Sequence, residues 1–137
     1  MKKTLPVMLF LLFGLAAQAQ EYLHKTESSV RSQVPYEIHS FIDKTGSKVI
    51  YWQDERSDCR YLNYISNVTQ TVYATIIMIK ERNMEIWLDW LNQNYRAITN
   101  KSWTTKQKSD IIITLSRDFD NDGWDLFISD TEGLKTN

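Results

Sequence analysis

A near-continuous apolar run over residues 71–79 constrains the fold more than any other segment. Its β-branched residues favour a strand, and a strand with so few polar positions must be covered on both faces. Residues 111–115 repeat this pattern, so both segments are expected near the middle of one sheet. Between them, apolar side chains recur at the spacing of one helix face, at Met84, Trp87, Leu88, Leu91 and Tyr95. The sequence therefore predicts one amphipathic helix, about residues 81–95, packed on the sheet.

The remaining strands are predicted from alternation and turn residues. Residues 36–53 are typical of a hairpin that turns at Gly46, and residues 59–66 of a third strand. The pair Asp122-Gly123 predicts a second hairpin that joins residues 110–116 to residues 124–129. The predicted fold class is α+β: a mainly antiparallel sheet of about six strands in the order ββββαββ, with the helix on one face. A right-handed crossover through the helix could make the strands on either side of it parallel.

The amino-terminal segment has the pattern of a bacterial signal peptide. Lys2 and Lys3 precede an apolar run over residues 5–16, and Ala17-Gln18-Ala19 supplies small residues at cleavage spacing. We therefore expect residues 1–19 to be removed and the mature chain to be periplasmic or secreted. No later apolar stretch is long enough to span a bilayer. The expected organisation is an arm over residues 20–33, a single domain over 34–130 and a tail over 131–137.

Charge and composition exclude several classes of protein. Loss of Lys2 and Lys3 with the signal changes the formal net charge from −1 to −3, which disfavours a nucleic-acid partner. A hydrophobic content of 42% disfavours a disordered chain. Cys59 is the one cysteine, so the chain cannot close an internal disulfide. Burial is the favoured interpretation of Cys59, and pairing between chains is the alternative.

An acidic turn is the candidate metal site. Asp118, Asp120 and Asp122 alternate before Gly123, and Asp125 follows. Alternating carboxylates on a curved loop can direct hard oxygens at one calcium ion. The segment resembles the start of EF-hand and dockerin loops, and the calcium turns of exported β-propeller repeats. That resemblance implies that the four aspartates bind calcium. The alternative is a solvated hairpin turn whose aspartates favour the turn geometry.

The same segment departs from both calcium patterns. Ser129 stands where an EF-hand would have a bidentate Glu, and a strand is predicted where a flanking helix would lie. The propeller turn usually has one more residue between Gly123 and Asp125.

Aromatic side chains on the predicted strands form the candidate binding surface: Tyr51, Trp52, Tyr61 and Tyr64. Adjacent strand residues face opposite sides of a sheet, and one helix covers only one side. Some of these rings should therefore be exposed, as a surface for a glycan, a peptide or a protein. In the alternative interpretation, the amino-terminal arm covers the second face.

Catalytic motifs are lacking from the sequence. His24 and His39 are not at metal-ligand spacing, and no local motif joins His39 to Cys59 as a thiol–imidazole pair. Overall, the signal ending and the Trp-rich helix after an apolar strand resemble small exported Bacteroidota proteins of unknown function, which implies a secreted accessory domain. The expected function is an exported, non-enzymatic binding domain. The alternatives are a calcium-stabilised structural domain, and a small hydrolase or hydrolase inhibitor.

Overall fold

A computed structural model describes residues 22–106 and 110–130 of the chain. The predicted signal peptide, the first residues of the arm and the tail lie outside the described residues.

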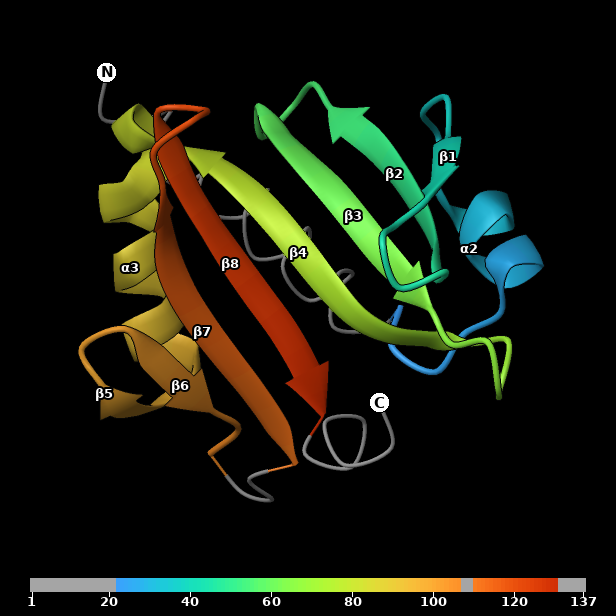
Figure 1. The fold of residues 1–137 in the computed structure, drawn as a ribbon. Coiled ribbons are helices and arrows are strands. Elements are labelled where there is room, and N and C mark those ends of the chain that lie inside the picture. Colours follow the sequence, from blue (N-terminus) through green and yellow to red (C-terminus); the bar gives the residue numbers. More distant parts are fainter. Residues whose placement is uncertain (1–21, 107–109, 131–137) are drawn as a thin grey trace.

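Within the described residues, eight strands form one sheet in the spatial order β1-β2-β3-β4-β8-β7-β6-β5 (Figure 1). Every neighbouring pair is antiparallel. The strands are β1 (His39–Ile42), β2 (Lys48–Asp54), β3 (Cys59–Ile65), β4 (Val72–Lys80), β5 (Arg96–Thr99), β6 (Ser102–Thr104), β7 (Ile111–Asp118) and β8 (Gly123–Asp130). The apolar runs predicted as central strands are β4 and β7, and β8 lies between them.

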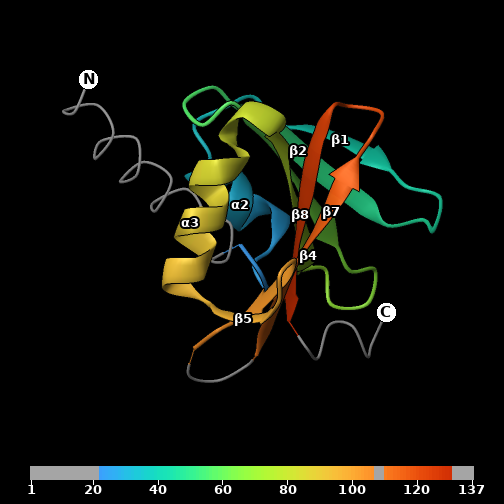
Figure 2. The same cartoon turned by 90° about the vertical axis from the view of Figure 1, so that its left-hand side faces the viewer.

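Two helices lie on the same side of this sheet (Figure 2). The amino-terminal arm contributes α2 (Glu27–Gln33). Its N-cap is Thr26, whose side-chain oxygen accepts a hydrogen bond from Ser29 N. A short 3₁₀ turn, η1 (Glu81–Asn83), leads from β4 into α3 (Met84–Asn94). The predicted helix therefore exists and buries the expected residue Trp87 on the sheet. No helix among the described residues is long and apolar enough to cross a membrane.

The hydrophobic core lies between the helices and the sheet. Trp87 and Leu91 of α3 and Val30 of α2 are fully buried there. Trp52 stacks on Tyr61 with ring centroids 5.6 Å apart, and Tyr22 of the arm meets Trp52 edge-on. Such aromatic pairs add about 0.5–1.5 kcal/mol each beyond the area that they bury. The arm therefore packs on the same face as α3, which we call the covered face.

The predicted fold class was wrong in its strand count and element order. The structure adds β5 and β6 after α3, and α2 before β1. All four residues of β5 are exposed, and β6 has three residues of which Trp103 is the one large apolar side chain. Short strands at a sheet edge bury too little to show a hydrophobic period, so sequence patterning could not identify them. Trp103 is fixed instead by α3, because its indole N–H donates to Asn92 Oδ1 at 2.8 Å.

The suggested parallel pair is also absent from this sheet. Strands β4 and β7 run in the same direction, but β8 lies between them and pairs antiparallel with both. The first strand of the predicted hairpin is likewise shorter than residues 36–53 suggest, because β1 begins only at His39.

Candidate functional site on the open face of the sheet

The side of the sheet opposite α2 and α3 carries no described helix, and we call it the open face (Figure 2). A row of apolar side chains crosses its middle: Tyr51, Leu62, Ile76 and Phe127. Each is paired in register with the next, and each is half-buried. Because neighbouring strands lie about 4.8 Å apart, the row is continuous. The open face therefore presents a band of partly exposed apolar surface.

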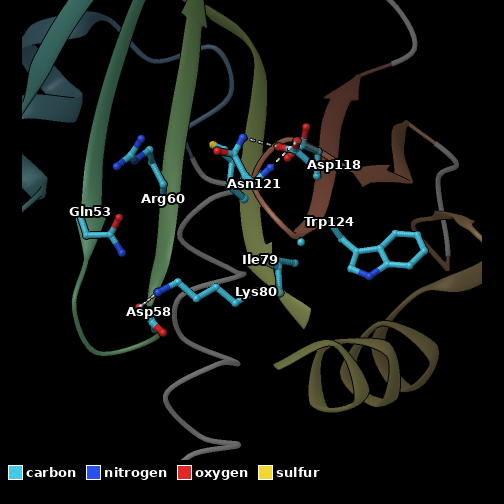
Figure 3. A pocket seen from close by; sticks show the side chains of 11 residues that line it. Gln53, Asp58, Arg60, Ile79, Lys80, Asp118, Asn121 and Trp124 are labelled. Carbon is cyan, nitrogen blue, oxygen red and sulfur yellow. Dashed lines mark hydrogen bonds and ion pairs between the residues drawn. The ribbon is translucent and has the colours of Figure 1, made fainter. Parts of the chain in front are cut away.

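A second row lies two residues further along the strands, in the order Gln53, Arg60, Met78, Asp125 and Ser116. Its first four members line a groove of about 180 Å³ that is closed at one end by the β7–β8 turn (Figure 3). A neighbouring hollow of about 380 Å³ shares Gln53 and Arg60 and extends to His39 on β1. Together, the groove and the neighbouring hollow form one depression that crosses strands β1 to β4 and β8 on the open face.

One side of the groove is acidic. Asp118 Oδ2 accepts from Asn121 Nδ2 at 2.9 Å, and Oδ1 accepts from Asn121 N at 3.3 Å. These bonds, the side-chain bond first, lower the pKa of Asp118. Burial raises the pKa of Asp125 to about 6, and the neighbouring Asp118 carboxylate adds to that rise. Asp125 Oδ1 is buried and has no hydrogen-bond partner within the described residues.

The opposite side of the groove is basic (Figure 3). Lys80 Nζ lies 3.1 Å from Asp58 Oδ1, and Arg82 pairs with the other oxygen of Asp58. The hydrogen bonds from Lys80 and Arg82 lower the pKa of Asp58. Arg60 is exposed and makes no ion pair in the part of the chain that the structure describes. Within residues 22–106 and 110–130, the groove therefore has a cation without an anion, Arg60 on β3, and an acid without a cation, Asp125 on β8.

The structure separates the four predicted calcium ligands into two groups. Asp118 and Asp125 both line the groove. Asp122 instead lies 3.4 Å from Arg117, and Asp120 is exposed in the turn. Among the described residues, no group of three or more histidine, cysteine, aspartate or glutamate side chains is arranged to hold a metal ion. Calcium binding stays a prediction, and melting curves recorded with calcium and with EDTA would test it.

The four predicted surface aromatics lie on two different faces. Tyr51 and Tyr64 are half-buried on the open face. Trp52 and Tyr61 are each only 2% exposed and belong to the core on the covered face. The cause is the two-residue period of a strand, which the sequence shows without revealing which set faces the helices. Tyr22 of the arm packs against Trp52 on the covered face, so the described part of the arm does not cover the open face.

Cys59 and His39 do not form a thiol–imidazole pair. Cys59 is fully buried on the covered face, as expected, and burial raises the pKa of its thiol to about 12. His39 lies on the open face beside Tyr51, with ring centroids 5.4 Å apart. The thiol is therefore protonated and inaccessible at neutral pH.

Arg60, Met78 and Lys80 line the groove but were not predicted from the sequence as site residues. Their alternation along β3 and β4 places them on one face, but the sequence does not reveal that β8 pairs with β4. No family model matches this chain, and neither does any curated protein or solved structure.

Proposed function

We propose that this protein is an exported, non-enzymatic interaction domain that binds its partner through the open face of the sheet. The observation that carries the proposal is the asymmetry of the two faces. Two helices cover one face, and the other presents a half-buried apolar row beside a groove with uncompensated charges. The leader residues Lys2 and Lys3 and the Ala17-Gln18-Ala19 site support export.

The composition of the open face is that of an interaction surface. An exposed apolar band with a polar and charged border is the usual arrangement at a protein interface. Tyr51, Phe127 and Met78 are residue types enriched at interfaces, and arginine, the residue type of Arg60, is enriched among the residues that contribute most to binding. A binding partner would remove the apolar row from water and supply counter-charges to the groove.

Site-specific photo-crosslinking tests this proposal. A benzophenone-bearing phenylalanine analogue replaces Phe127 on the open face, and in a separate variant replaces Phe119. Phe119 is the matched control, because it is 84% exposed in the β7–β8 turn, where Arg117 lies over its ring. In cells that express the full chain, we expect a defined cross-linked species from position 127 only. Equal cross-linking from both positions, or none from position 127, would contradict the proposal.

A further inference from the structure

We infer that the partner of the open face is a second copy of this chain, related by a two-fold axis along β4, with Arg60 of each copy paired to Asp125 of the other. The inference rests on the proposed function, because it names the partner of the same surface. The second copy is identified by the complementary charges of Arg60 and Asp125, which lie on either side of β4 on the same face.

The register of the sheet supplies the geometry. Met78 on β4 pairs with Arg60 on one side and with Asp125 on the other. A two-fold axis that lies in the interface along β4 exchanges the positions of β3 and β8 between the two copies. Arg60 of one copy then lies opposite Asp125 of the second, and the reverse pair forms by symmetry. Gln53 and Ser116, the next members of the row, are opposed in the same way.

The apolar row obeys the same symmetry. Leu62 and Phe127 flank Ile76, so the axis along β4 places Leu62 against Phe127 of the second copy and Ile76 against itself. Two sheets that pack face to face lie about 10 Å apart with strands within about 30° of each other. The resulting dimer has four layers, with α3 of each copy on the outside.

Charge compensation distinguishes this partner from a purely apolar one. Asp125 is partly buried beside Asp118 without a cation, and Arg60 has no anion in the described part of its own copy. In the dimer, Arg60 and Asp125 each face an opposite charge on the other copy, and the two-fold axis forms this pair twice. Lys80 lies on β4 and therefore close to the axis, but its charge is already compensated by Asp58 of the same copy.

The size of the face predicts a weak dimer. Five strands, β2, β3, β4, β8 and β7, cover about 24 Å by about 23 Å, or roughly 550 Å² from each copy. This area lies near the lower end for specific protein interfaces. We therefore expect a dissociation constant in the micromolar range.

The test is the molar mass of the full mature chain by light scattering and sedimentation, over about 1–300 µM. The native chain should shift from one-copy to two-copy mass. Arg60→Asp and Asp125→Arg should each raise the dissociation constant at least about 10-fold, because each places like charges across the axis. The double variant R60D/D125R should recover the dimer. A mixture of the two single variants should form a 1:1 dimer, because each variant then faces opposite charges.

The matched control is Asp89→Arg, a charge reversal on the exposed side of α3, which should leave the dissociation constant unchanged. A native chain that keeps one-copy mass over the whole range would overturn the inference. So would a dimer that both single variants leave intact, or single variants whose mixture does not associate. If the chain is monomeric but position 127 still cross-links to another protein, the inference fails while the proposed function stands.

Discussion

At the scale of single residues, Asp125 is a carboxylate whose partial burial costs the fold stability at neutral pH. It lies on the floor of the groove, partly buried, with the Asp118 carboxylate beside it. Its folded-state pKa of about 6 lies above the ordinary value for an aspartate. Between those two values the native state binds a proton that the unfolded state releases. The contribution of Asp125 to the free energy of unfolding therefore falls as the pH rises through this window.

Asp125→Asn should stabilise the monomer at pH 7.5, because the neutral amide removes the cost of a partly buried carboxylate. We expect a gain of about 1 kcal/mol after allowance for solvent screening at a partly exposed site, and a smaller gain at pH 4. Urea unfolding at about 1 µM, where the inferred dimer is dissociated, measures it.

Asp120→Asn is the matched control, because Asp120 is exposed in the same turn. It should change the free energy of unfolding by less than about 0.5 kcal/mol. If both variants raised the free energy of unfolding equally at pH 7.5, the cause would be the lower negative charge of the turn. Burial of Asp125 would then not explain the gain. The same Asp125→Asn change should weaken self-association, since it removes the partner of Arg60.

At the scale of elements, the contact between β4 and β8 decides where the groove lies. Strand β8 begins at Gly123, which pairs with both Lys80 of β4 and Asp118 of β7. A side chain at this position would place its Cβ only 2.4 Å from the carbonyl oxygen of Ile79. The close approach of the two strands therefore requires a glycine, for lack of space and not for a special backbone angle.

Gly123→Ala should destabilise the protein by about 1–3 kcal/mol, because the added methyl group must push β8 away from β4. Gly46→Ala is the comparison: its Cβ would meet nothing within 4 Å, but its φ of +87° strains any other residue. That change should cost about 1 kcal/mol. Thermal or urea unfolding of both variants gives the order, and a cost at Gly123 no greater than at Gly46 would contradict the steric argument.

At the scale of the whole molecule, the core lies on the covered face, and the open face is the surface through which we infer self-association. If the inferred dimer forms, its stability must depend on pH. The charged groups that face Asp125 are Asp118 from β7, Lys80 from β4 and Arg60 from β3, the last supplied by the second copy. Arg60 prefers the ionised form of Asp125, so association releases a proton wherever the monomer has Asp125 protonated.

Self-association should therefore weaken as the pH falls from about 7.5 to about 5, through the monomer pKa of about 6. Sedimentation at fixed ionic strength and several pH values measures the dissociation constant directly. The Asp125→Asn variant is the control, and its weaker association should vary less over the same range. Association that strengthens in acid would show that apolar contact and reduced net charge dominate instead.

Several features could be predicted from the sequence because local chemistry determines them. The apolar runs predicted β4 and β7, the helical period predicted α3, and the Asp122-Gly123 pair predicted the turn before β8. Burial of Cys59 followed from its place in a strand-like run and from the usual burial of a free cysteine. In each case, side chains within a few residues of one another carry the signal.

Other features depended on partners that lie far apart in the sequence. The exposed strand β5 and the short strand β6 have too little apolar surface to be recognised alone. The period of β2 and β3 separated Trp52 and Tyr61 from Tyr51 and Tyr64, but only packing against the helices showed which set is buried. The sequence by itself determined the central strands, the main helix and the acidic turn. Only the tertiary structure placed β8 beside β4, and so Arg60 and Asp125 on either side of Met78, because strand pairing joins residues that no local pattern connects.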